Sequence, residues 1–183
     1  MASEKRWKKQ GFTLSETMAA ILIMGLVGLI IVGGFSAYIR SWRNITRKAN
    51  AELFVSTLEV KMQEELEYAT EVAVGDNNEV VWFADDGTGY PTMFVKDENG
   101  RLLGISTSAN PDNLASMPAS ELVSDGTSDG MYATYADLTY DETTHAFTIN
   151  ELTIKRESDN RTLYQLGTLK IRNVNDAPVV NSK

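Results

Sequence analysis

Few side chains in this sequence could hold a metal ion or attack a substrate. The 183 residues include no Cys and a single His, which excludes thiol nucleophiles and Cys-ligated zinc sites. Three carboxylates precede His145 and could ligate a metal ion together with it: Asp137, Asp141 and Glu142. The same residues also fit a polar turn between two strands, which is the interpretation that we favour. We therefore predict no metal site, no cofactor and no catalytic residue.

Two acidic, glycine-containing stretches resemble loose calcium-binding loops. They are Asp-Asp-Gly-Thr-Gly at 85–89 and Asp-Gly-Thr-Ser-Asp-Gly at 125–130. Neither has the ligand spacing or the terminal Glu of an EF-hand loop, and both are typical of ordinary turns. The sequence has no Gly-x-Ser-x-Gly nucleophile motif, and a Ser-His-Asp triad would need His145. We do not expect this protein to be an enzyme.

Thr17–Ile39 form a run of 23 residues without a charge. As a helix, with a rise of ~1.5 Å per residue, the run would extend ~35 Å, and the hydrocarbon core of a bilayer is ~30 Å thick. The apolar region of a secretory signal peptide is shorter, about 7–15 residues, and small residues follow it. We therefore predict a membrane-spanning helix over 12–39. Glu16 stands at its start, where the helix dipole favours a negative charge, but a carboxylate carried into the membrane needs a partner.

Basic residues flank the apolar run on both sides, four before it and four after it, so the positive-inside rule gives no orientation. The residues that follow the run are called the basic collar: Arg40, Arg43, Arg47 and Lys48. The collar could contact lipid headgroups and stabilise the helix exit, or it could form salt bridges to acidic parts of neighbouring molecules. DNA binding is a third interpretation, which four cations and the nearby Trp42 support only weakly.

The residues just before the apolar run form the motif Gly11-Phe12-Thr13-Leu14-Ser15-Glu16. After a short basic leader and before an apolar helix, this motif closely resembles the class III signal of type IV pilins and pseudopilins. The resemblance covers about residues 1–40, so it concerns processing and assembly rather than the specific task of the rest of the chain. It implies that Thr13, Leu14 and Glu16 serve recognition and assembly.

The same resemblance implies how the precursor is processed. A prepilin peptidase would cut between Gly11 and Phe12 on the cytoplasmic side, remove the leader 1–11 and N-methylate Phe12. The N-terminus of a single-pass precursor in the cytoplasmic membrane would therefore lie in the cytoplasm. The processed chain would then enter a cell-surface or periplasmic filament with other pilin or pseudopilin subunits, through an assembly platform and indirectly its ATPase.

Glu16 matches the family's glutamate that pairs with the N-terminal amine of a neighbouring subunit. A buried carboxylate and a buried ammonium compensate each other, whereas either alone is costly. Such a contact joins different surfaces of two subunits, and contacts of this kind that do not close into a ring give helical filaments.

The helix is predicted to continue beyond the membrane as an amphipathic segment over 40–71. Apolar residues recur there at three- and four-residue intervals: Ala51, Val55, Leu58, Met62, Leu66 and Ala69. We expect one long helix over roughly 12–70, with its second half packed on a sheet. Residues 1–48 carry a net charge of +6 and residues 49–183 carry −14. The acidic part argues against general nucleic-acid binding, so nucleic acid would be a partner only of a competence filament.

Residues 72–174 are predicted to form an antiparallel β-sheet head, which makes the fold class α+β and pilin-like. The expected strands are 80–84, 92–96 and 101–106, a single strand over 131–140 and a single last strand over 163–174. Within 131–140, alternation places Tyr132, Thr134, Leu138 and Tyr140 on one face. The apolar phase breaks after Ile149, which predicts a bulge near Asn150. We also expect a variable loop over 107–130 and a frayed C-terminal tail over 175–183.

These features lead to three functional hypotheses. A minor pilin is the first, because the head is larger than a small pseudopilin needs. A pseudopilin of a type II secretion or DNA-uptake machine is the second. The third is a bitopic membrane protein with a ligand-binding head that never polymerises. Leader cleavage separates the third hypothesis from the other two.

Overall fold

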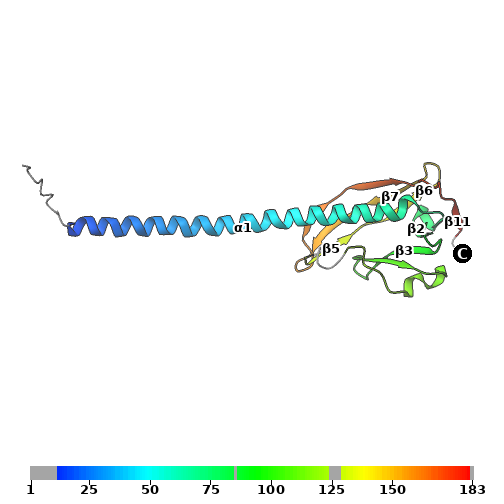
Figure 1. Cartoon of the computed structure of the whole chain (residues 1–183), viewed down its shortest axis with the longest axis horizontal. Coiled ribbons are helices and arrows are strands. Elements are labelled where there is room, and N and C mark those ends of the chain that lie inside the picture. The colour runs from blue at the N-terminus through cyan, green and yellow to red at the C-terminus, as the bar shows by residue number, and fades with distance from the viewer. Residues whose placement is uncertain (1–11, 85, 124–128, 182–183) are drawn as a thin grey trace, which may run out of the picture. The chain divides into compact units, whose positions relative to one another are not determined.

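The computed structural model describes residues 12–84, 86–123 and 129–181. The chain divides into two compact units, with the division between Ile45 and Thr46. One α-helix, α1 (Leu14–Glu67), contributes its first part to the first unit and its second part to the second unit (Figure 1). The helix that we predicted over about 12–70 is therefore present, and it ends three residues earlier than expected.

In the first unit, α1 exposes its apolar side chains. Within the described ranges it is the one helix long and apolar enough to cross a membrane, and the most apolar window of α1 contains no buried residue. A Cβ added at any of four glycines would meet nothing within 4 Å: Gly25, Gly28, Gly33 and Gly34. A continuous apolar surface of this kind is unfavourable in water, so this part of α1 requires lipid or other apolar helices around it.

In the second unit, one face of α1 is buried against β-sheets. The buried residues of α1 are Ala51, Phe54, Val55, Leu58, Met62 and Leu66. This face confirms the predicted apolar stripe and adds Phe54 to it. Together with strand residues such as Phe83 and Phe147, these side chains form the hydrophobic core. The combination of this helix with mostly antiparallel sheets confirms the α+β fold class.

The C-terminal end of α1 is held by a distant part of the chain. The Nδ2 group of the buried Asn173 donates hydrogen bonds to the carbonyl oxygens of Leu66 (3.0 Å) and Ala69 (2.8 Å). The backbone N–H of Val174 donates to the carbonyl of Glu67 (2.8 Å). The last carbonyls of a helix lack intrahelical donors, so these bonds satisfy groups that a C-terminal glycine motif satisfies in many other helices.

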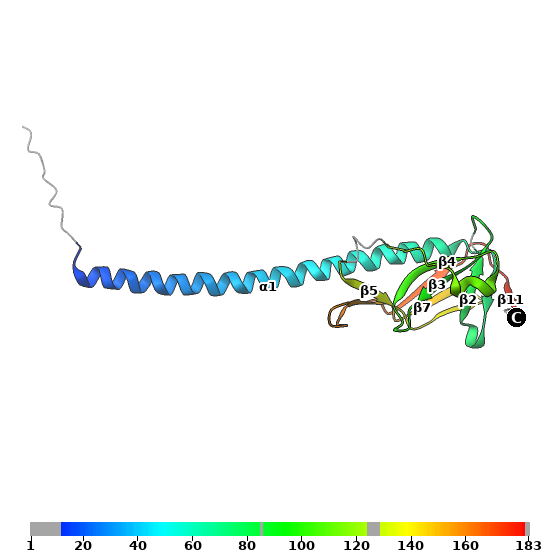
Figure 2. The same cartoon turned by 90° about the horizontal axis from the view of Figure 1, so that it is seen from below.

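One sheet has five strands in the order β11-β1-β2-β3-β4. Figure 2 labels four of them: β2, β3, β4 and β11. The strands of this sheet are β1 (Val72–Val74), β2 (Val80–Ala84), β3 (Pro91–Lys96), β4 (Leu102–Thr107) and β11 (Val179–Asn181). A short 3₁₀ turn, η1 (Asp76–Asn78), connects β1 to β2. Neighbouring strands are antiparallel except β11, which pairs with β1 in parallel. The predicted strands over 80–84, 92–96 and 101–106 agree closely with β2, β3 and β4.

The remaining six strands form an antiparallel meander of three chain segments, each of which is interrupted once near its middle. We call these segments ribbons: β5 with β6, β7 with β8, and β9 with β10. The six strands make two three-stranded sheets, β10-β7-β6 and β5-β8-β9. The strands are β5 (Met131–Thr134), β6 (Leu138–Asp141), β7 (Ala146–Asn150), β8 (Thr153–Arg156), β9 (Thr162–Gln165) and β10 (Thr168–Arg172). Met131 pairs with Arg156 and Leu138 with Ile149, so the register is the same on both sides of the break. We call the interruption at 135–137, 151–152 and 166–167 the crease.

The crease overturns three details of the sequence prediction. Residues 131–140 are not one strand, because the inward face changes there: Met131 and Ala133 are buried before the crease, and Leu138 and Tyr140 after it. Tyr132 and Thr134 were therefore assigned to the wrong face. Residues 163–174 are likewise split into β9 and β10.

The predicted bulge near Asn150 is also wrong. A bulge inserts an extra residue into one strand, but here the register continues unchanged. The phase break instead follows from Glu151, whose backbone has a positive φ of 55°. The Glu151 N–H donates to the carbonyl of Gly167 (2.8 Å), which joins the middle ribbon to the outer one at the crease.

The segments expected as a variable loop and a frayed tail contain regular structure. After β4 the chain forms a 3₁₀ helix, η2 (Pro111–Ser116), in which Leu114 is buried. The hydroxyl of Ser106 donates to the Leu114 carbonyl (2.8 Å), and Ile105 and Ser120 exchange backbone hydrogen bonds. Residues 124–128 of the predicted loop lie outside the described residues. In the predicted tail, Val179–Asn181 form β11 rather than a frayed end.

Candidate functional site

Thr13 and Glu16 form a reciprocal cap at the start of α1. The Glu16 carboxylate oxygen Oε2 accepts hydrogen bonds from the Thr13 backbone N–H (2.9 Å) and the Thr13 hydroxyl (2.8 Å). The Glu16 N–H in turn donates to the Thr13 hydroxyl oxygen (3.4 Å). This is a capping box, in which a Thr before the first turn and a Glu three residues later satisfy helix N–H groups that have no intrahelical acceptor.

The capping box is a role of Glu16 that the sequence analysis missed. The signal was available, because Thr-x-x-Glu before an apolar run is the pattern of this motif. In the structure, the Oε1 oxygen of Glu16 has no hydrogen-bond partner among the described residues. Glu16 can therefore cap its own helix and still offer one oxygen to a cation.

Of the two residues that flank the predicted cleavage point, the structure describes only Phe12. Gly11 lies outside the described residues. Phe12 is 88% exposed and Leu14 is 80% exposed, so both side chains are accessible. The assignment of cleavage to Gly11 and Phe12 and of methylation to Phe12 remains a prediction.

The basic collar divides between the two units. Arg40 and Arg43 belong to the first unit, and Arg47 and Lys48 to the second. All four side chains are exposed. Across the described ranges, none of them makes an ion pair. Their charges are therefore available to groups outside the chain.

Arg47 also borders a cavity of about 390 Å³ in the second unit. Asn50 of the same helix lines this cavity and donates to Asp129 Oδ2 (3.4 Å), and Arg156 lines it from β8. The guanidinium of Arg156 contacts Asp159 (3.1 Å). Acidic and basic groups thus share the lining of this cavity.

The structure does not bring the candidate metal ligands around His145 together. Asp137 accepts a hydrogen bond from the Asn150 side chain (2.6 Å). Asp141 accepts from the Thr144 hydroxyl (2.8 Å) and the Thr143 N–H (2.9 Å). These bonds lower the pKa of Asp141, the Thr144 hydroxyl making the largest contribution.

Asp137 therefore joins two neighbouring ribbons at the crease, and Asp141 stabilises the turn between β6 and β7. Among the residues that the structure describes, no group of three or more His, Asp or Glu side chains could hold a metal ion. The two calcium-like loops fall partly outside this description, because Asp85 and residues 125–128 are not described. Asp129 of the second loop contacts Asn50 instead.

The comparison with protein families gave one match. Residues 8–32 match the family described as the prokaryotic N-terminal methylation motif. The match lies within the segment on which the resemblance rested, and it confirms that recognition. Neither the comparison with curated proteins nor the comparison with solved structures gave a match.

Proposed function

We propose that this chain, whose residues 8–32 carry the class III signal of type IV pilin-like and pseudopilin precursors, is a minor pilin. It is a structural subunit rather than an enzyme. The observation that carries the proposal is the match to the methylation motif over residues 8–32, a segment that overlaps the apolar start of α1 at Leu14.

In this proposal the precursor is anchored in the cytoplasmic membrane by the apolar part of α1, with its N-terminus in the cytoplasm. A prepilin peptidase cuts between Gly11 and Phe12 and methylates the new amine of Phe12. Removal of the leader also removes four basic residues that could hold the N-terminus at anionic headgroups: Lys5, Arg6, Lys8 and Lys9.

Assembly follows from the pairing of Glu16 with the Phe12 amine of a neighbouring copy or of another pilin subunit. The capping box supports this role, because it holds the Glu16 carboxylate at the helix start and leaves Oε1 without a partner among the described residues. The exposed apolar surface of α1 supplies the packing between helices. The assembly platform and its ATPase act on the subunit indirectly, during its incorporation into the filament.

The basic collar has a secondary place in the proposal. Its four exposed cations contact lipid headgroups in the precursor and acidic second units of neighbouring subunits in the filament. Exposed ion pairs of this kind contribute little each, typically less than about 1 kcal/mol. Nucleic acid becomes a partner only if the filament serves DNA uptake.

The test is co-expression of the full chain with and without a prepilin peptidase, followed by intact-mass measurement and N-terminal sequencing. We expect a peptidase-dependent chain that begins at Phe12 and carries one added methyl group. Gly11→Val should block this change. An unprocessed chain in the presence of an active peptidase would refute the proposal and favour a bitopic protein that does not polymerise.

Assembly is tested separately with Glu16→Gln and the matched control Glu121→Gln, which neutralises an exposed carboxylate of the second unit. We expect both variants to be processed, but only the control to appear in filaments sheared from cells. Recovery in a secretion or DNA-uptake apparatus, rather than in surface filaments, would favour a pseudopilin. Equal assembly of both variants would contradict the role of Glu16.

A further inference from the structure

Strands β2 and β3 separate after only two paired residues, although each strand continues. The pairs are Phe83 with Thr92 and Ala84 with Pro91. In the same register, Trp82 would face Met93 and Val81 would face Phe94, but the ladder has ended there. We call this opening between residues 80–82 and 93–96 the wedge.

On the wedge side, β3 has a free backbone edge at Phe94. The carbonyl of Pro91 accepts from Ser108, so Pro91 faces the β4 side of the strand. Backbone groups alternate between the two sides of an antiparallel strand, so the N–H and C=O of Phe94 face β2. Among the described residues, Phe94 has no pairing partner on that side. A free edge of this kind accepts an added strand.

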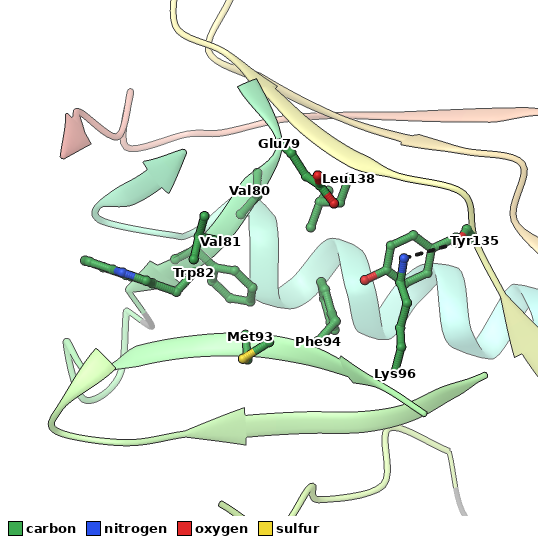
Figure 3. Close-up of a pocket in the computed structure, with 10 residues that line it drawn as sticks. Glu79, Val80, Val81, Trp82, Met93, Phe94, Lys96, Tyr135 and Leu138 are labelled. Atoms are coloured by element: carbon green, nitrogen blue, oxygen red, sulfur yellow. Dashed lines mark hydrogen bonds between the residues drawn. The ribbon is translucent and has the colours of Figure 1, made fainter. Parts of the chain in front are cut away.

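A cavity of about 280 Å³ lies in the wedge (Figure 3). Its lining combines the apolar side chains of Phe94 and Leu138 with the aromatic ring of Tyr135 and two opposite charges, Glu79 and Lys96. In Figure 3 the Glu79 carboxylate lies near Leu138, and the Lys96 side chain points to Tyr135 at the other side of the cavity. An apolar space between two charges suits a segment with an apolar and a polar side chain.

Lys96 has one donor left for such a segment. Its ammonium donates to the carbonyls of Tyr135 (3.2 Å) and Ala136 (3.3 Å) and lies 3.6 Å from the centre of the Tyr135 ring. An ammonium carries three N–H groups, so one remains. No described carboxylate lies within ion-pair distance of it. Burial lowers the pKa of Lys96, an effect that the more distant Glu79 and Asp137 oppose.

We infer that the wedge binds an extended polypeptide segment of a partner protein, which pairs with β3 at Phe94, places an apolar side chain in the cavity and sets a carboxylate beside Lys96. Main-chain hydrogen bonds supply affinity in strand addition, and pockets for alternate side chains supply specificity. The charge of the carboxylate complements the half-buried ammonium. This inference does not depend on filament assembly, because the wedge lies wholly in the second unit.

The test uses the full chain in detergent micelles and a set of fluorescently labelled seven-residue peptides. Alternate positions of these peptides are Val or Thr, and the central polar position is Asp, Ser or Lys. We expect saturable binding by fluorescence anisotropy, with Asp-containing members the tightest. Methylation of the peptide backbone nitrogens removes donors without changing the side chains, and it should abolish binding.

Two pairs of variants locate the site. Val81→Trp fills the mouth of the wedge and should weaken binding about tenfold or more, whereas Leu103→Trp enlarges a similarly exposed residue of β4 and should not. Lys96→Met should remove the preference for Asp, and Lys170→Met on β10 should keep it. Hydrogen exchange of the Phe94 amide should slow when peptide is bound.

Several results would overturn the inference. They are binding by no member of the set, equal binding of the backbone-methylated peptides, tighter binding of the Lys members, or equal effects of Val81→Trp and Leu103→Trp. Since Val81→Trp changes an exposed side chain, its effect is measurable even if Lys96→Met fails to fold.

Discussion

At the scale of single residues, the side chain of Asn173 connects two distant parts of the chain. Its side chain is fully buried and makes three hydrogen bonds, two as donor to Leu66 and Ala69 and one as acceptor from the Ala177 N–H (2.8 Å). All three partners are backbone groups of buried residues. Asn173 therefore joins the end of α1 to the C-terminal chain.

We predict that Asn173→Ala lowers the free energy of unfolding of the second unit by about 2–4 kcal/mol, because three hydrogen bonds to buried backbone groups are lost. Asn175→Ala is the matched control. The Asn175 side chain is exposed and donates to the Tyr68 carbonyl (2.7 Å), so its loss should cost about 1 kcal/mol. Urea unfolding followed by circular dichroism measures both. Equal losses would show that burial of Asn173 does not matter.

Two carboxylates, Asp97 and Asp141, make the free energy of unfolding depend on pH in the acidic range. The Arg101 N–H donates to Asp97 (2.8 Å) and is the largest cause of its lowered pKa. Asp141 has a lowered pKa for a similar reason, as described above. A carboxyl whose pKa is lower in the folded state stabilises the fold above its unfolded pKa of about 3.9, and this contribution is lost as the pH falls through the folded pKa.

We therefore predict that part of the stability difference between pH 7 and pH 3 disappears in Asp97→Ala and in Asp141→Ala. Glu98→Ala and Glu142→Ala remove exposed carboxylates from the same two turns and serve as controls. Unfolding free energies of all four variants at both pH values test this. If the controls reduce the pH difference as much as the Asp variants, the turn hydrogen bonds are not its cause.

At the scale of elements, β4 and the chain that follows η2 approach each other too closely for a side chain at residue 104. A Cβ added to Gly104 would overlap the backbone carbonyl of Ser120. Backbone cannot move aside as a flexible side chain can, and Ile105 and Ser120 are held together by two hydrogen bonds. The glycine therefore fixes the path of a segment that looked like a free loop.

We predict that Gly104→Ala destabilises the second unit by about 1–3 kcal/mol, the usual cost of forcing extra volume into a packed site. Gly167→Ala is the control, because a Cβ there meets nothing within 4 Å. Thermal unfolding of the two variants should separate them. A neutral Gly104→Ala would mean that the segment at Ser120 yields without cost.

The elements also show how far sequence reasoning reached. The helix and β2 to β4 were predictable, because the apolar spacing and the turn over 97–100 are local signals. The crease was not predictable, because it depends on the positive φ of Glu151. Glutamate rarely adopts a positive φ, so its presence in a sequence does not predict one. The change in apolar alternation beside Asn150 was visible in the sequence. The two outer ribbons are interrupted at the same place because they pair with the ribbon that contains Asn150. The wedge likewise depends on where two strands part, which no local pattern encodes.

At the scale of the whole molecule, the chain combines a basic apolar N-terminal part with an acidic second unit. The net charges are +4 for residues 1–45 and −12 for residues 46–183. Every residue of the hydrophobic core lies between Ala51 and Ala177. The apolar part of α1 before residue 46 contributes nothing to that core, so the second unit has what it needs to fold alone.

We predict that a chain comprising residues 46–183 is soluble and folded without detergent, because it contains the whole hydrophobic core and its strong negative charge opposes association. Gel filtration and circular dichroism should show a compact monomer, whereas residues 12–183 should need detergent. Aggregation of the shorter chain would mean that the first part of α1 stabilises the second unit after all.

The hold of the C-terminal chain on α1 also constrains the order of events during synthesis. Asn173 bonds to a residue 107 positions earlier, and β11 (Val179–Asn181) pairs with β1. The apolar start of α1 leaves the ribosome before the second unit and can insert into a membrane at once, but the second unit cannot close until residues 173–181 have been synthesised. Until then the apolar face of α1 that packs in the core is exposed, and proteases and chaperones can bind it before the strands cover it.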